Sequence, residues 1–147
     1  MGYYIAIGNA VPKFDKDDGE LYARWVVEET SNENAPSFIG DVCTENRNIR
    51  LPSYTGWGEF CDKVGLTELF YDRYEGLFRQ HPGCVMITQE HYQTVVDALE
   101  EYQKHTKRPP GYDEFGNYDY NFARLMWLEY WMKWALENCE TPAIFNS

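Results

Sequence analysis

The spacing of apolar residues changes at Pro52, and this change constrains the fold more than any other feature of the sequence. Before Pro52 the pattern favours strands, with candidates at residues 3–8 and 38–42. Residues 21–28 alternate with a period of two, so every second side chain is expected on one buried face. The members of that face are Leu21, Ala23, Trp25 and Val27.

After Pro52 the apolar residues recur at helical spacing. The expected helices cover residues 54–64, 67 to about 80, 88–105 and about 119–138. Gly65 ends the first helix, Thr67 caps the second, and a short strand is expected near Val85 and Ile87. These patterns predict an α+β fold in one globular domain, residues 1–147. An N-terminal antiparallel sheet of about three strands has three or four helices packed against it, and the C-terminal helix is largely buried.

Arg124 is out of place on the last helix. At 100° per residue it falls between Trp131 and Ala135, on the face that should be buried. A guanidinium without a partner in a low-dielectric site costs several kcal/mol. Arg124 therefore needs either a carboxylate of the sheet, several carbonyl groups, a stacking indole or a ligand anion.

The segment RNIRLPSYTGWGEFC, residues 47–61, has two possible meanings. Arg47 and Arg50 precede a helix start that carries Thr55 and Trp57, and arginines beside a helix N-terminus can bind an anion. The glycine pattern matches neither a Walker loop nor a dinucleotide-binding fingerprint. The alternative is a strand-to-helix junction, in which Pro52 ends a strand and Ser53 or Thr55 caps the helix.

An anionic metabolite or nucleotide could be bound between the arginines and stacked aromatic rings. The candidate ligand-binding residues are Arg24, Arg47, Arg50, Thr55, Trp57, Arg124, Trp127 and Trp131. Convergence of the four arginines in one concave pocket would favour this hypothesis, because like charges cluster where an anion compensates them.

The chain carries a formal net charge of −11, which disfavours direct nucleic-acid binding and suits a basic protein partner. The connector at residues 107–120 interleaves aromatic and acidic side chains, which is typical of a contact surface. The candidate partner-binding residues are Tyr112, Asp113, Glu114, Phe115, Tyr118 and Asp119. In the alternative interpretation the connector folds back and its aromatic rings cover the sheet.

The sequence favours a non-enzymatic protein. Its four cysteines lack the spacing of a metal site, and no nucleophile motif or cofactor loop occurs, so we expect no catalytic residue, metal or cofactor. Cysteine usage and the absence of a signal peptide or membrane span predict a cytoplasmic protein that does not associate with membranes. Ile144 and Phe145 look exposed in the tail and could dock on the domain or on a second copy, so a homo-oligomer is possible.

Two phrases, HPGCVMIT at residues 81–88 and ENCETPAIFN at 137–146, resemble those of uncharacterised small proteins encoded by bacteriophages. The resemblance implies the host cytoplasm as the setting and a role in blocking or redirecting a host system, with defence and nucleic-acid handling as candidate systems. It carries over no functional residue. Together with the charge, it favours a non-catalytic inhibitor or modulator of a host protein, with anionic-ligand binding as the alternative.

Overall fold

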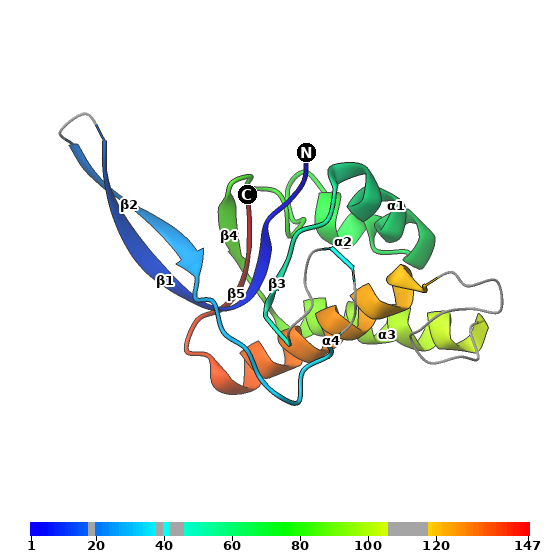
Figure 1. The fold of residues 1–147 in the computed structure, drawn as a ribbon. Coiled ribbons are helices and arrows are strands. Elements are labelled where there is room, and N and C mark those ends of the chain that lie inside the picture. The colour runs from blue at the N-terminus through cyan, green and yellow to red at the C-terminus, as the bar shows by residue number, and fades with distance from the viewer. Residues whose placement is uncertain (18–19, 38–39, 42–45, 106–117) are drawn as a thin grey trace.

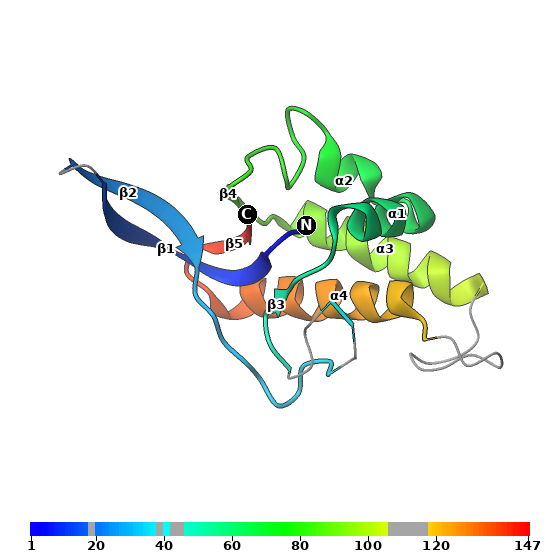
Figure 2. The same cartoon turned by 45° about the horizontal axis from the view of Figure 1, so that its top comes forward.

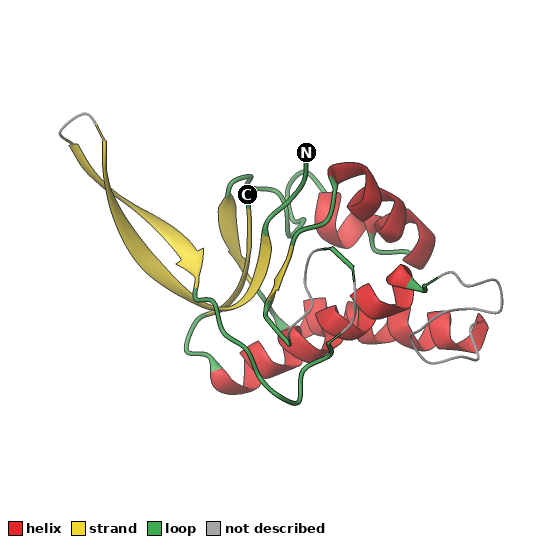
Figure 3. Ribbon diagram, viewed as in Figure 1, coloured by secondary structure: helices red, strands yellow, loops and turns green. Residues whose placement is uncertain are grey.

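The chain, seen in a computed structural model, is described for residues 1–17, 20–37, 40–41, 46–105 and 118–147, with the backbone only at 15–17 and 20–23. Within these residues it is an α+β fold of five strands and four helices, and every strand pair is antiparallel (Figures 1 and 3). The strands are β1 (Ile5–Asp17), β2 (Glu20–Val27), β3 (Ile49–Arg50), β4 (Gly83–Met86) and β5 (Pro142–Asn146). The helices are α1 (Tyr54–Val64), α2 (Thr67–Tyr71), α3 (Gln89–His105) and α4 (Tyr120–Asn138).

The sheet contains strands from both ends of the chain, which corrects the expected N-terminal sheet of three strands. Its order is β2-β1-β5-β4, with β3 paired to the beginning of β1. The C-terminal strand β5 is therefore central, and Ile144 and Phe145 are buried in it. They looked exposed because a four-residue apolar run near the chain end has too little pattern to distinguish a tail from a buried strand. The candidate strand at 38–42 lies mostly outside the described residues.

The two faces of the sheet differ in what covers them. Ile5 and Ile7 of β1, Val85 of β4 and Ile144 of β5 pack into one core with the helices, whose ribbons lie on one side of the sheet (Figure 2). On the opposite face a smaller cluster forms from strand residues alone. The buried members of this cluster are Ala6, Ala10, Val27, Ile49, Ala143 and Phe145. No described helix contributes to this second cluster, so the face is covered only by the curl of the sheet itself.

That curl comes from the long β1–β2 hairpin, which projects from the body in Figure 1. Residues 10–17 of β1 pair with β2, and the end of β2 comes back over the second face to contact β4 and β5. Val27 is buried as expected from the alternation, but Trp25 is 54% exposed. The expectation of a buried Trp25 is wrong because this part of the hairpin lies beyond the helices. The side chains of Leu21 and Ala23 lie outside the described set.

The boundaries of three helices follow the sequence signals. Ser53 caps α1 by accepting a 2.9 Å hydrogen bond from the Gly56 N–H, and Gly65 ends it in the left-handed conformation. Thr88 accepts a hydrogen bond from the His91 N–H at the start of α3. Asp119 caps α4, which buries eight side chains as the prediction of a largely buried C-terminal helix requires. None of the described helices has the length and apolar character that crossing a membrane requires.

The second helix is shorter than predicted. It was expected to continue to about residue 80, but α2 ends at Tyr71, and Leu66 rather than Thr67 is at its N-cap position. The reason is Asp72, whose carboxylate accepts hydrogen bonds from the N–H groups of Tyr74 and Glu75 and so replaces the helical bonds with a turn. The apolar residues after this turn still reach the core, because Leu77 and Phe78 are buried.

Candidate functional site

Two of the four arginines converge, on the carboxylate of Asp41. Arg124 donates to it through Nε at 2.8 Å and Nη2 at 2.7 Å, and Arg50 donates through Nε at 3.0 Å. The side chains are 12%, 1% and 5% exposed for Arg124, Arg50 and Asp41. Burial alone would raise the pKa of Asp41, but the two guanidiniums outweigh it and hold that pKa below its ordinary value of 3.8.

The surroundings of this ion triad fix it in place. Arg50 lies over the ring of Trp127, with 5.8 Å from its guanidinium carbon to the ring centroid, and Arg124 lies over Phe60 at 5.7 Å. Asp41 itself has a φ of 51°, and Gly40 before it has a φ of 122°. A Cβ at residue 40 would approach the Tyr120 ring to 2.6 Å, so glycine is required both by conformation and by space.

The arrangement is that of a structural ion cluster. Asp41 takes the position that a ligand anion would occupy, and it is one of the partners that the wheel position of Arg124 demanded, although it lies in a loop and not in the sheet. The Asp41 carboxylate joins its loop to β3 and, across a separation of 83 residues, to α4. The segment 47–61 is accordingly a strand-to-helix junction, with Ser53 as the cap.

The remaining predicted ligand residues lie apart from the triad. Arg47 forms an exposed ion pair with Glu29, and Arg24 lies on β2. Thr55 is exposed in the first turn of α1. Three indoles, those of Trp57, Trp127 and Trp131, are fully buried in the core. The structure therefore brings Arg50, Arg124 and Trp127 together and leaves the other five predicted residues elsewhere.

The predicted partner surface is only partly described. Tyr112, Asp113, Glu114 and Phe115 lie outside the described residues. Tyr118 packs its ring against Tyr120, with centroids 5.0 Å apart. Asp119 accepts hydrogen bonds from the Tyr102 hydroxyl at 2.9 Å and from the Phe122 N–H at 3.0 Å, so its carboxylate has a structural role.

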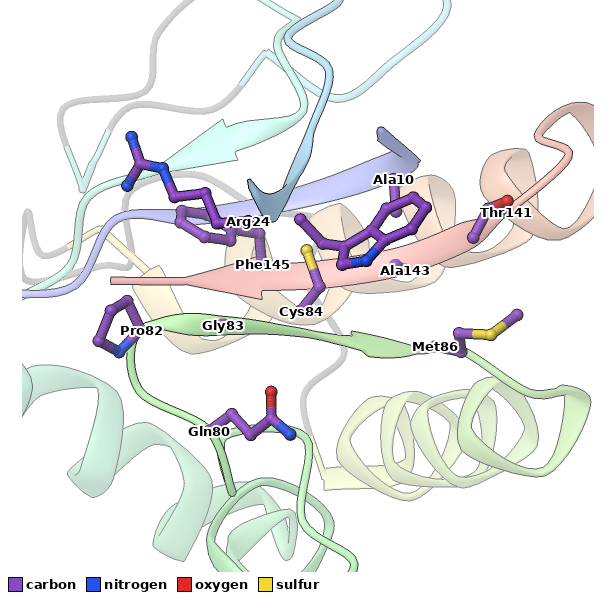
Figure 4. A pocket seen from close by; sticks show the side chains of 11 residues that line it. Ala10, Arg24, Gln80, Pro82, Gly83, Cys84, Met86, Thr141, Ala143 and Phe145 are labelled. Carbon is purple, nitrogen blue, oxygen red and sulfur yellow. The ribbon is translucent and has the colours of Figure 1, made fainter. Parts of the chain in front are cut away.

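A larger feature lies on the helix-free face of the sheet, where the curled hairpin encloses a hollow of about 650 Å³ that we call the cup. Arg24 and Trp25 of β2 line it on one side. In Figure 4, Cys84 and Met86 lie on β4, and Ala143 and Phe145 lie on the neighbouring β5. The lining residues are Ala10, Arg24, Trp25, Gln80, Pro82, Gly83, Cys84, Met86, Thr141, Ala143 and Phe145. This volume is in the range of ligand-binding sites in proteins.

Small residues keep the cup open. Ala10 and Ala143 both line it, on the neighbouring strands β1 and β5, where Ala143 pairs with Gly8, two residues before Ala10. Larger side chains at these positions would fill the space beneath β2. The rim of the cup instead carries large side chains that are exposed to solvent. Trp25 is 54% and Met86 59% exposed, and Phe14 on the same hairpin is 65% exposed. Large apolar side chains kept in solvent beside a hollow mark an interaction site more often than isolated ones do.

The titratable groups in and beside the cup are Cys84 and His81. Burial raises the pKa of the Cys84 thiol to about 11, so at neutral pH it is protonated and a poor nucleophile. His81 donates from Nδ1 to Asn146 Oδ1 at 2.5 Å, because Asn146 Nδ2 donates to the Gln80 carbonyl and so orients the amide. Asn146 and Phe145 are consecutive in β5 and point to opposite faces, which separates this histidine from Cys84.

No family model, curated protein or solved structure matches the chain. Function is therefore inferred from the cup, its rim and the charge of the chain.

Sequence reasoning missed most of the cup, because its residues come from four segments whose proximity depends on the curl of the sheet. Trp25 was predicted to be buried, and of the lining residues only Arg24 was among the predicted site residues. One signal was present: Gly8 and Ala10 alternate with larger residues in β1, and small residues on one face of a strand leave room beside it. That signal does not reveal which other strands surround the space.

Proposed function

We propose that the protein is a non-catalytic binding protein that holds a basic protein partner in the cup and thereby inhibits or modulates that partner. The observation that carries the proposal is the pair of exposed apolar side chains, Trp25 and Met86, at the edge of a hollow of about 650 Å³. Aromatic and methionine side chains in such positions are typical anchors of protein interfaces.

The charge of the chain supports a basic partner. A net charge of −11 attracts a cationic surface over long distances and accelerates encounter, while the apolar cup supplies short-range attraction after contact. Glu90 and Glu140 are exposed, the first four residues after Met86 and the second next to Thr141 in the sequence. The resemblance to bacteriophage proteins suggests a host protein as the target, with defence and nucleic-acid handling as candidate systems.

The test compares two cup variants with a matched control. Trp25→Ser and Met86→Ser remove exposed apolar anchors, and Tyr74→Ser removes a 76% exposed aromatic ring that does not line the cup. A host protein is captured on the wild-type chain, purified, and titrated against each variant at low and high salt. We expect both cup variants to bind at least roughly tenfold more weakly, Tyr74→Ser to bind like wild type, and added salt to weaken binding. Equal affinities of all variants would contradict the proposal, as would a failure to find any stoichiometric partner.

A second candidate is the binding of a small anion with an apolar body. The observation in its favour is that Arg24 lines both the cup and an adjoining hollow of about 310 Å³, which Lys13 also lines. The probes are anilinonaphthalene sulfonate and its uncharged analogue N-phenylnaphthylamine. Preference for the sulfonate, lost in Arg24→Gln, would support this candidate. Equal binding of the two dyes by both proteins would exclude it.

A further inference from the structure

The outer edge of the sheet beside the cup is open. Strand β4 pairs with β5 on one side, and within the described residues no strand pairs with its other side. In Figure 4, β4 lies below β5, and Gln80 lies beyond it near its beginning. An open edge offers a row of backbone N–H and C=O groups to another extended chain.

The register tells which backbone groups face outward. Ile87 donates its N–H to the Pro142 carbonyl, and in an antiparallel ladder the residues that bond to the neighbour alternate. Gly83 and Val85 therefore face β5, and the N–H and C=O groups of Cys84 and Met86 point to the open edge. Neither residue makes a backbone hydrogen bond to any other described part of the chain outside that ladder.

This edge also lacks the usual protection against pairing. Charged side chains, above all lysine, commonly protect exposed edges. The sequence of β4 is Gly-Cys-Val-Met, with no charge, whereas the opposite edge strand β2 contains Glu20 and Arg24. Pro82 precedes β4 and limits pairing only at its beginning. The neutral edge lies next to the cup and to exposed Met86, so the same side of the molecule offers hydrogen bonds and an apolar hollow.

We propose that the partner supplies an extended segment that adds to the sheet as a strand along β4, in the mode called β-augmentation. This inference rests on the proposed function and names the part of the partner that the cup holds. The partner residues opposite Cys84 and Met86 direct their side chains to the same face as those two, which is the face of the cup. Apolar residues belong at those positions, and basic residues belong at the alternate ones because of the net charge of the chain.

The experiment uses short random peptides displayed on a surface and selected on the full chain. We expect the selected sequences to alternate apolar and basic residues. A selected peptide is then titrated against wild type, Met86→Ala and Met86→Pro. Both variants shorten the side chain, but only Met86→Pro removes the outward N–H, and proline is tolerated in an edge strand where its N–H faces away from the ladder. Met86→Pro is expected to bind roughly tenfold more weakly than Met86→Ala.

If Met86→Pro does not fold, the inference can still be tested by amide hydrogen exchange of the wild-type chain, monitored by NMR. The amides of Cys84 and Met86 in the wild-type chain should become protected when the peptide binds. Binding that depends on Trp25 but leaves these amides unprotected and Met86→Pro equal to Met86→Ala would overturn strand addition and leave the proposed function standing. If no selected peptide depends on Trp25, both fail. A dimer of the free chain that dissociates in Met86→Pro would show that a second copy occupies the edge, and would overturn the assignment to a partner.

Discussion

Replacing Asp41 by asparagine tests whether the arginine cluster is structural. The substitution keeps the size of the side chain and one oxygen acceptor but removes the charge that compensates Arg50 and Arg124. Three hydrogen bonds end on that carboxylate, and all three side chains have low exposure. Two guanidiniums would then share a buried site in which no other carboxylate of the described residues pairs with them. Removing one partner of a buried ion pair costs about 3–5 kcal/mol.

That cost is large compared with the stability of an ordinary domain. Folded proteins are stable by about 5–15 kcal/mol, so Asp41→Asn should remove about a fifth or more of the free energy of unfolding. For a chain of this size each kcal/mol corresponds to about 2–4 °C, which predicts a fall in Tm of about 6–20 °C. Urea unfolding and thermal unfolding at neutral pH, both followed by circular dichroism, measure the two quantities.

The matched control is Glu29→Gln. Glu29 pairs with Arg47 at 3.2 Å, but both side chains are about half exposed, so this pair is expected to contribute about 1 kcal/mol or less. Each substitution removes one negative charge. Any general relief of repulsion in a chain of charge −11 is therefore the same in both variants and cancels when they are compared. The interpretation fails if Asp41→Asn lowers stability by no more than Glu29→Gln, or if its effect disappears at high salt as an exposed pair would.

Three further outcomes follow from the structure. Because the folded-state pKa of Asp41 is depressed, its contribution is fully present above the ordinary value of 3.8 and is lost as the pH falls through the folded-state pKa, so wild type and Asp41→Asn should converge in stability in acid. Asp119→Ala removes the cap of α4 and the acceptor of the Tyr102 hydroxyl. It should lower the free energy of unfolding, measured in urea, by about 1–2 kcal/mol, and an unchanged value would show that the cap is dispensable. The Cys84 thiol, with its pKa raised to about 11, should react with iodoacetamide at mildly alkaline pH roughly a hundredfold more slowly than an ordinary thiol, as measured by peptide mass mapping; reaction at the ordinary rate would contradict the assigned burial.

The placement of Arg124 shows how far local pattern can be trusted. The wheel position predicted a buried guanidinium, because the eight buried residues of α4 determine which sides of the helix face the core. The same reasoning demanded a partner but could not identify Asp41. The partner lies 83 residues away, in a loop whose position depends on a residue with positive φ. Residue types and spacing predict the need for a counter-charge, whereas tertiary structure determines which carboxylate meets it.

Helices and strands also differ in how well the sequence predicts them, because some signals are local and others depend on distant parts of the chain. The first helix was predicted at its observed bounds because Ser53 and Gly65 act within the segment they bound. The second was predicted too long because one carboxylate, that of Asp72, competes with the helix for backbone N–H groups. Strand β5 was missed because its four apolar residues are recognisable as a strand only when β1 and β4 flank them.

The sheet also explains why the arginine cluster and the cup are separate sites. Successive residues of β1 point to opposite faces, so Ile5 lies opposite Arg50 on the helix side while Ala6 lies opposite Phe145 on the other. The helix face is filled with the large side chains of the main core and with the ion pairs of Asp41. The other face has alanines on its floor and exposed Trp25 and Met86 on its rim. We therefore place the proposed binding on the face whose side chains do not contribute to the main core, where apolar surface can remain exposed without weakening the fold.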